Sequence, residues 1–370
     1  MKRIGLIVNP IAGLGGRVGL KGSDGEELQR KAIQLGAVPM ALERAGEALK
    51  ALLAAHVDFE LTTSPGSMGE KSALQAGIAA EVIGSIASVP TSAEDTIRAA
   101  GEMVQRGVDL ILFAGGDGTA RDLCKAIGLE IPALGIPAGV KIQSAVFATT
   151  PRHAGEVTAA HLRGETELRP AEVMDLDEQA FRAGRVSANL YGYLKIPYLQ
   201  RYIQGVKAAT PMSESGVHTA IAKELSGRLK PGWLYIFGPG TTTQAVAVAL
   251  GIEKTLLGVD AVMDGKVVAA DCSEADLLNY LSGGCRSEII VTPIGGQGCL
   301  FGRGNQPISP EVIRKVGRAH IRVVSSPEKI QALQGSPFWV DTGDPLVDDM
   351  LNGYIEVITG YREYILYRVA

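Results

Sequence analysis

The 370-residue chain lacks several features by which some classes of protein are identified. It has four cysteines, and none lies in a Cys-x-x-Cys pair or near a histidine at a zinc-ligand spacing. We therefore expect idle thiols in a reducing cytoplasm. Aromatic residues make up 5% of the chain, which argues against a platform for stacking single-stranded bases.

An excess of one charge and long apolar runs are missing as well. The formal charge is −4, and no polybasic run is present, so we expect neither nucleic acid nor a membrane surface as a partner. The apolar run Ile4 to Val8 follows two basic residues, as in a signal peptide, but Asn9-Pro10 ends it early. With no run of about 18 apolar residues elsewhere, the sequence predicts a cytoplasmic protein without a membrane span.

Glycine, in contrast, is abundant, with 46 residues that cluster in short loops after apolar runs. The length favours two domains. Over the first ~150 residues, short apolar runs alternate with amphipathic stretches, which predicts an α/β domain with a parallel sheet. The expected strands are 4–8, 59–62, 81–84, 110–113 and 133–136, and the expected helices are 26–35, 41–55, 91–106 and one that begins at Ala120.

Beyond about residue 165 the chain becomes richer in strands. We expect strands at 172–175, 189–194, 233–237, 255–262 and 288–292, and helices at 213–225 and 273–281. We place an α/β domain at 1–165, a strand-rich domain of mixed α+β type at 166–335, and a C-terminal segment at 336–370. That last segment shows strand-like alternation, and we expect it to pack back on the N-terminal domain.

The motif that carries most chemistry is Gly115-Gly116-Asp117-Gly118-Thr119. It follows a buried strand and precedes a helix, so it sets free N–H groups and a helix N-terminus at the carboxyl edge of the sheet, where phosphates bind. Thr119 is expected to cap the helix. An acid beside bound phosphate needs a metal or a proton, and both roles belong to phosphoryl transfer. The alternative is that Asp117 only supports a tight glycine turn.

Further candidates follow other strands. The long loop from Asn9 to Gly25 is rich in glycine, and Arg17 and Lys21 add cations that suit a polyphosphate, although it is no Walker loop. Lys141 follows a third strand end. Phosphate-binding or nucleotide-binding roles are assigned to Asn9, Gly13, Gly15, Gly16, Arg17, Lys21, Gly115, Gly116, Gly118, Thr119, Lys141, Gly240, Thr241, Thr242, Gln297, Arg303 and Asn305.

A metal site is less clearly marked. Asp117 and Asp24 are candidate Mg²⁺ ligands. Asp175 and Asp177 would share one face of a strand and could join Asp117, although a solvent-facing acidic strand is the favoured interpretation. The five histidines show no ligand spacing.

These motifs together resemble those of one family, the predicted ATP- or polyphosphate-dependent NAD kinases, which include a protein of acetoin-catabolism operons and belong to the NAD kinase and diacylglycerol kinase superfamily. The resemblance covers nearly the whole chain and rests on segments 9–22, 115–122, 135–141, 295–298 and 302–306. It implies an N-terminal α/β domain, a β-rich, β-sandwich-like second domain and an active site between them.

The resemblance further implies the reaction. A phosphoryl group would pass from ATP or polyphosphate, with Mg²⁺, to the adenosine-ribose 2′-hydroxyl of NAD or NADH, and the protein would be a homo-oligomer. Asp117 aligns with the acid that acts on the acceptor hydroxyl. Typical NAD kinases also carry an Asn-Glu or Asn-Asp pair, and here no asparagine precedes an acid. A kinase of a lipid, sugar or other nucleoside, and a non-catalytic nucleotide-binding regulator, therefore remain alternatives.

Overall fold

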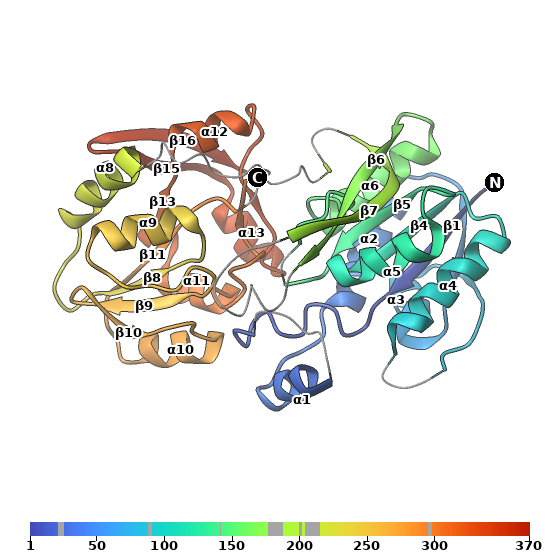
Figure 1. Ribbon diagram of the computed structural model, residues 1–370, viewed down its shortest axis with the longest axis horizontal. Helices are drawn as coiled ribbons and strands as arrows, with labels where there is room; N and C mark the ends of the chain where they lie inside the picture. The colour runs from blue at the N-terminus through green and yellow to red at the C-terminus, as the bar shows by residue number, and fades with distance from the viewer. Residues whose placement is uncertain are drawn as a thin grey trace.

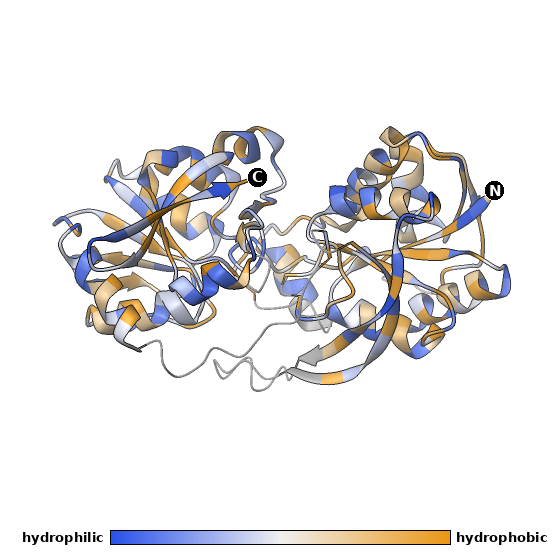
Figure 2. Cartoon of the chain, turned by 90° about the horizontal axis from the view of Figure 1, so that it is seen from above, coloured by the Kyte–Doolittle hydropathy of each residue, from blue (hydrophilic) through white to orange (hydrophobic). Residues whose placement is uncertain are grey.

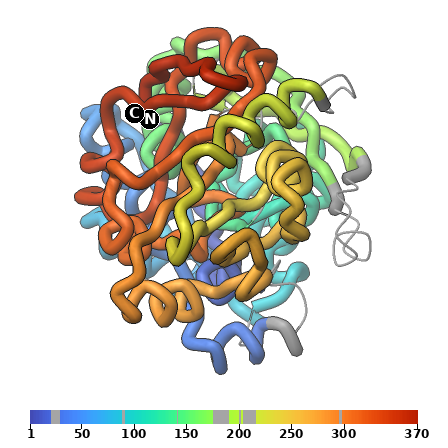
Figure 3. The backbone as a smooth tube through the Cα atoms, turned by 90° about the vertical axis from the view of Figure 1, so that its left-hand side faces the viewer, coloured from blue at the N-terminus to red at the C-terminus, as the bar shows by residue number. Residues whose placement is uncertain are grey.

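Two α/β units lie side by side along the long axis of the molecule (Figure 1). Viewed from its left-hand side in Figure 1, the second unit lies in front of the first (Figure 3). The computed structural model describes residues 1–20, 26–87, 91–140, 142–176, 188–199, 202–203, 215–294 and 298–370.

The first unit is built on a sheet of five parallel strands. Their order across the sheet is β3 (Ala80–Val82), β2 (Phe59–Thr63), β1 (Lys2–Val8), β4 (Leu110–Gly115) and β5 (Ala133–Pro137). The predicted parallel α/β architecture is thus confirmed. The chain leaves β1 toward one edge of the sheet for β2 and β3, and then returns to the other side for β4. The β1–β4 pair is therefore the switch point of a doubly wound sheet, where ligands bind outside the carboxyl ends of strands.

The helices of this unit pack in pairs, α2 with α6 and α4 with α5, and each pair contacts the sheet. Their bounds are α1 (Glu26–Gln34), α2 (Ala41–Ala54), α3 (Glu70–Ala76), α4 (Ala93–Gln105), α5 (Asp117–Ile127) and α6 (Pro151–Leu162), with a 3₁₀ turn η1 (Gly66–Met68). Sequence patterns had not indicated α3 and α6. The strands inside each unit are coloured largely as hydrophobic in Figure 2, and their apolar residues belong to the buried cores.

An antiparallel hairpin, β6 (Glu167–Leu176) and β7 (Ala188–Tyr198), packs on the first unit. Ala171, Val173, Leu194 and Ile196 belong to the same hydrophobic core as the first sheet. The sequence assigned these strands to the domain 166–335, but the apolar side chains of the hairpin are buried against α5, β5 and α6. The hairpin therefore belongs structurally with the first sheet.

The second unit holds a sheet of seven strands. Their order is β10 (Lys266–Ala269), β9 (Asp260–Met263), β8 (Leu234–Phe237), β11 (Ser287–Val291), β13 (Ile321–Val324), β15 (Gly353–Gly360) and β16 (Glu363–Val369). The four strands β8, β11, β13 and β15 are parallel, and antiparallel strands flank them. The strand-rich character of the second unit is thus confirmed.

Helices rather than a second sheet cover both faces of this sheet. Ile289 packs in a core with α10 (Glu274–Ser282), α11 (Pro310–Val316) and α13 (Pro345–Leu351). The next residue, Ile290, packs in a separate core with α8 (Ser215–Ser226) and α9 (Thr241–Ala249). Because successive strand residues face opposite sides, the unit is a three-layer α/β/α structure and not a β-sandwich.

The C-terminal segment extends the second sheet. β15 pairs with β13, and β16 pairs with β15. Most of the segment 336–370 is therefore part of the second sheet, while Asp341 and Trp339 at its start contact Arg44 and His153 of the first unit, as the expected packing on the N-terminal domain requires. The remaining elements of the unit are β12 (Cys299–Phe301), β14 (Trp339–Val340), α12 (Pro327–Ala332) and the 3₁₀ turn η3 (Arg318–His320).

Candidate active site

The Gly115–Thr119 turn lies at the carboxyl end of β4, at the switch point of the first sheet. Gly116 is the N-cap of α5, and Asp117 is already the first helical residue. The expectation that the helix begins at Ala120 with Thr119 as its cap was therefore wrong by one turn. The hydroxyl of Thr119 instead accepts a 3.0 Å hydrogen bond from the side-chain amide of Asn9, at the end of β1.

Asp117 is buried, with 8% of its surface exposed. Its two carboxylate oxygens accept hydrogen bonds from the backbone N–H groups of Gln143, at 2.8 Å, and Ser144, at 2.9 Å. Burial raises the pKa of this carboxyl, and the hydrogen bonds from Ser144 and Gln143 oppose that rise. Each oxygen keeps lone-pair capacity for a further donor, so the carboxylate is fixed in position and can still accept a proton.

The three glycines of the turn differ in how closely their surroundings pack. A β-carbon on Gly115 would lie 2.4 Å from the hydroxyl oxygen of Thr119, and one on Gly116 would lie 3.2 Å from the α-carbon of Gly139. A methyl group at Gly115 would collide with Thr119, and one at Gly116 would press against the backbone of Gly139. A β-carbon on Gly118 would meet nothing within 4 Å. Packing alone therefore does not explain why Gly118 is glycine.

The glycine loop after β1 folds into consecutive turns, held by hydrogen bonds such as Leu20 N–H to the carbonyl of Gly15 at 2.9 Å. Gly13 has φ of +77°, and a β-carbon there would lie 2.0 Å from the carbonyl oxygen of Ala138. A β-carbon on Gly16 would lie 3.2 Å from the Gln306 side chain, which belongs to the second unit. The loop therefore packs against both units.

A pocket opens where the two units meet. It is lined by the glycine loop, by α2 and by the segments that follow β5 and β12. Among the lining residues are Gly13, Gly16, Arg17, Arg44, Gly139, Arg303, Gln306, Ile308, Ser309 and Thr342. Three of these lining residues, Arg17, Arg44 and Arg303, are arginines. Gly139, which also lines the pocket, lies against Gly116 of the Asp117 turn. Asp117 itself does not line the pocket, although its charge and that of Arg303 influence one another.

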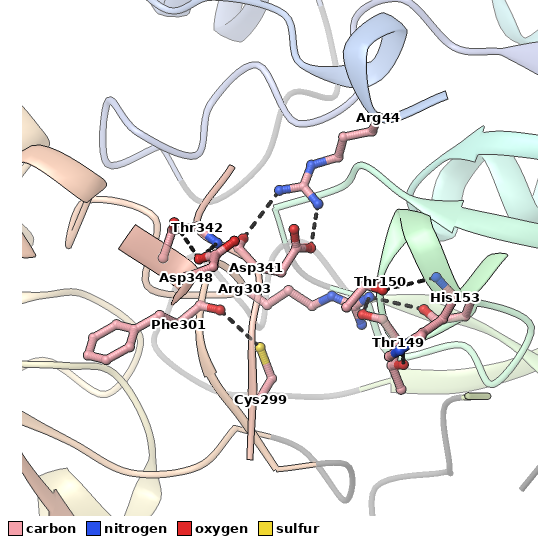
Figure 4. A network of polar contacts seen from close by, with 12 residues as sticks. Arg44, Thr149, Thr150, His153, Cys299, Phe301, Arg303, Asp341, Thr342 and Asp348 are labelled. Atoms are coloured by element: carbon pink, nitrogen blue, oxygen red, sulfur yellow. Dashed lines mark hydrogen bonds and ion pairs between the residues drawn. The ribbon is translucent and has the colours of Figure 1, made fainter. Parts of the chain in front are cut away.

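A network of buried polar groups joins the units beside this pocket (Figure 4). Arg44 of α2 forms an ion pair with Asp341, and the two side chains are only 11% and 10% exposed. Arg303 crosses in the other direction and donates to the backbone carbonyls of Ala148, at 3.1 Å, and Thr149, at 2.6 Å. Sequence reasoning missed Arg44 and Asp341, because neither lies near a recognisable motif.

Several predicted residues lie outside both the pocket and the polar network. Asn305 is fully buried and braces its own loop, accepting from Gly302 N–H and donating to the Leu300 carbonyl. Its side-chain oxygen and nitrogen are therefore both engaged within the loop. Gly240, Thr241 and Thr242 lie at the start of α9, outside the pocket lining. Lys21, Asp24, Lys141, Asp177 and Gln297 fall outside the described residues.

The described residues provide little for a metal ion. No group of three or more histidine, cysteine, aspartate or glutamate side chains converges anywhere in the described ranges. Asp117 fits a partial role, since Mg²⁺ in phosphoryl-transfer enzymes is usually held by one or two carboxylates, waters and the phosphates of the substrate.

No helix within the described ranges is long and apolar enough to cross a membrane.

Comparisons with known proteins agree with this geometry. Two protein-family models match, the ATP-NAD kinase N-terminal domain over residues 4–166 and the ATP-NAD kinase C-terminal domain over residues 232–369. No curated protein is similar enough to this chain to be matched.

Solved structures are only distantly similar. One described as a putative diacylglycerol kinase from Bacillus anthracis str. Sterne shares 19% identity, with 48% of this chain and 46% of that chain covered and a TM-score of 0.25. The YcaC gene product of Escherichia coli, described as an octameric hydrolase of unknown specificity, shares 15% identity over 44% of this chain and 72% of that one, with a TM-score of 0.21. The chain spans less than half the length of the first of these proteins. With TM-scores of 0.25 and 0.21, both similarities are too weak to support a conclusion about this chain.

Proposed function

This chain belongs to the ATP-NAD kinase family, and we propose that it transfers a phosphoryl group from ATP to the adenosine-ribose 2′-hydroxyl of NAD or NADH. The observation that carries the proposal is the position of Asp117. The carboxylate is held by two backbone N–H groups at a helix N-terminus, at the switch point of the sheet, next to a pocket with three arginines.

Each part of this arrangement has a role in the reaction. The acceptor hydroxyl oxygen attacks the γ-phosphorus of ATP, the bond from that phosphorus to the β-phosphate oxygen breaks, and ADP leaves. The proton of the hydroxyl passes to the carboxylate of Asp117. Arg17, from the glycine loop, and Arg44 offset phosphate charge in the pocket. Mg²⁺, when bound with the donor, would neutralise charge on the β- and γ-phosphates.

The direct test is product identification. The purified protein is incubated with Mg²⁺, with ATP, another nucleoside triphosphate or polyphosphate as donor, and with NAD, NADH or a sugar as acceptor. We expect a product 80 mass units heavier than NAD or NADH, roughly the mass of one added phosphoryl group. A protein that binds NAD and ATP but forms no phosphorylated product from any donor would be a binding protein, and the proposal would be wrong.

The activity should depend on pH through Asp117. Only the ionised carboxylate can accept the proton, and burial raises its pKa. The value of kcat/KM should therefore fall as the pH is lowered through this raised pKa, at a higher pH than an ordinary aspartate near 3.9 would give. A pH–rate profile that stays flat down to about pH 4 would contradict this role.

Gly118→Ala separates ligand binding from stability. The position is helical and open, so alanine should keep the fold and raise stability by up to about 1 kcal/mol. If phosphate approaches the backbone at this turn, the added methyl group will block it, and we expect kcat/KM to fall at least roughly tenfold. Urea unfolding and steady-state kinetics on the same preparation check both halves. Gly115→Ala is the contrast, because its β-carbon collides with Thr119 and should lower stability.

A different acceptor is the second candidate. No asparagine in the chain precedes glutamate or aspartate, so the pair by which typical NAD kinases hold NAD is missing. The acceptor arms of the product experiment test this point, since a phosphorylated sugar in place of NADP would identify a sugar as the acceptor.

A further inference from the structure

Arg303 is a buried cation that has no role in the steps of the proposed reaction. It follows β12 in the second unit and is only 9% exposed. Its side chain extends into the first unit, toward Thr149 and His153 (Figure 4). There its Nη2 atom donates to two backbone carbonyls, of Ala148 at 3.1 Å and of Thr149 at 2.6 Å. Burying a charge is costly unless hydrogen bonds hold it, so these two carbonyls fix the position of the guanidinium.

The segment 143–149, which accepts these bonds, also holds the carboxylate of Asp117. Its first two N–H groups, of Gln143 and Ser144, donate to the two carboxylate oxygens at 2.8 and 2.9 Å. Its last two carbonyls are the acceptors for Arg303. The residues between these ends are buried and form backbone hydrogen bonds with β5 and β6. Because a close-packed interior transmits a displacement instead of absorbing it, a shift at the Arg303 end of the segment reaches the Asp117 end.

A ring contact from the second unit supports the same end of this segment. The ring of His153 packs edge-on against Trp339 of β14, with the ring centroids 4.7 Å apart. The hydroxyl oxygen of Thr149 lies 2.6 Å from Nδ1 of that histidine. The second unit therefore holds the end of the segment twice, through a guanidinium and through an aromatic ring. The ion pair of Arg44 with Asp341 joins the two units at a further point.

From this arrangement, we propose that Arg303 is a positioning residue for the reaction. By holding the segment 143–149 from the second unit, it fixes the two N–H groups that aim the carboxylate of Asp117 at the acceptor hydroxyl. This inference rests on the proposed function, in which that carboxylate is the general base. It adds that a residue of the second unit sets the geometry of a base in the first. Because a misplacement of about 1 Å can lower a rate by about 100-fold, a small shift of the segment is enough to slow the reaction.

The kinetic test is Arg303→Met, which removes both hydrogen bonds and keeps an unbranched side chain. We expect kcat for NADP formation to fall roughly 10- to 100-fold, with the KM values for ATP and NAD within about twofold of wild type. The KM values should change little because the pair of Arg44 and Asp341 still joins the units beside the pocket. Arg303→Lys keeps an ammonium that can donate to the same carbonyls, so its kcat should lie between the two. Steady-state kinetics with each substrate varied in turn give both constants.

Hydrogen exchange tests the hold on the segment without any turnover. In Arg303→Met, the backbone amides of 143–149 should exchange roughly tenfold faster than in the wild-type protein, as for the loss of a hydrogen bond to a charged group. If no donor gives a phosphorylated product while this exchange still rises, the proposed reaction is wrong and Arg303 nevertheless holds the segment. If NADP is formed and Arg303→Met forms it at the wild-type rate, the reaction stands and the positioning role is wrong.

Arg322→Met is the matched control. Arg322 is also a partly buried arginine of the second unit, and its guanidinium donates to a backbone carbonyl, that of Ala319 at 3.0 Å. It lies on β13, outside the pocket lining. Its loss should lower the Tm but leave kcat and the exchange of 143–149 unchanged. Trp339→Leu is a second test variant, because it removes the ring contact and keeps Arg303, and it should lower kcat by a smaller factor.

Three results would overturn the positioning role of Arg303. The first is a wild-type kcat in folded Arg303→Met. The second is a raised KM with an unchanged kcat, which would make Arg303 a residue that binds substrate phosphate. The third is wild-type exchange of 143–149 in Arg303→Met. If Arg303→Met does not fold, a wild-type kcat in both Arg303→Lys and Trp339→Leu would overturn it equally.

Discussion

Asp117→Asn should lower kcat by roughly 100- to 10,000-fold, the range expected for the loss of a general base. The amide has the shape of the carboxylate but cannot accept the proton of the acceptor hydroxyl at neutral pH. Its NH₂ group would also face one of the two backbone N–H donors, of Gln143 or Ser144. That mismatch should cost about 1–3 kcal/mol of stability, so the variant should still fold. Steady-state kinetics measure the loss of rate, and urea unfolding measures the stability.

Asp95→Asn is the matched control for this variant. The carboxylate of Asp95 is also buried and accepts from two backbone N–H groups, of Ala87 at 3.1 Å and Ser92 at 2.9 Å. It lies at the start of α4 and not at the phosphate turn. It should therefore show a comparable or larger loss of stability with nearly normal kcat. If Asp117→Asn keeps kcat within tenfold of the wild-type value, Asp117 is a structural residue and not the base.

Local patterns predicted the first unit well, for identifiable reasons. Strands β1, β4 and β5 of the first sheet contain short apolar runs, and the run Leu110–Phe113 indicated coverage on both faces. The glycine turn after it does lie between the carboxyl end of β4 and the start of a helix, as the pattern predicted. The helix start was misjudged because Thr119 has the typical residue type of a cap, whereas Gly116 caps through its backbone conformation and Asn9 engages Thr119.

The second unit shows where the same signals were underused. Leu234–Phe237 and residues 289–291 are apolar, buried stretches of neighbouring strands. Such continuous apolar stretches favour a sheet covered on both faces, and that rule would have favoured helices on both sides. The bracing role of Asn305 could not be seen in the sequence, because glycine-rich loops around a ligand and around an internal hydrogen bond have the same composition.

The contacts between units were beyond local patterns altogether. Arg44 lies on a helix, 297 residues from Asp341 in the chain, and nothing in either segment marks the other as its partner. Such a pair is set by how the two units dock, which depends on the whole folded surface of each. It is nevertheless where the structure makes its strongest prediction about stability.

Breaking the Arg44–Asp341 pair should destabilise the protein by about 3–5 kcal/mol, because the remaining partner keeps a buried charge without its counter-ion. Arg44→Met leaves Asp341 near the half-buried carboxyl of Asp348, and Asp341→Leu leaves the Arg44 guanidinium. The double variant should be clearly less destabilised than the sum of the two single variants. Urea unfolding of all four proteins gives the coupling energy, which we expect to exceed about 1 kcal/mol.

The exposed pair Arg152–Glu156 on α6 is the matched control, since its side chains are 79% and 32% exposed and its coupling should be below about 1 kcal/mol.

The pH dependence of stability gives a second measurement on the Arg44 cluster. Burial already raises the pKa of Asp348, and the positive charge of Arg44 opposes that shift. Without Arg44 this pKa rises further, so the folded protein binds more protons than the unfolded chain, and stability falls as the pH rises. The destabilisation by Arg44→Met should therefore be smaller at pH 5 than at pH 8, and an equal loss at both pH values would show that this cluster is not held together by charge.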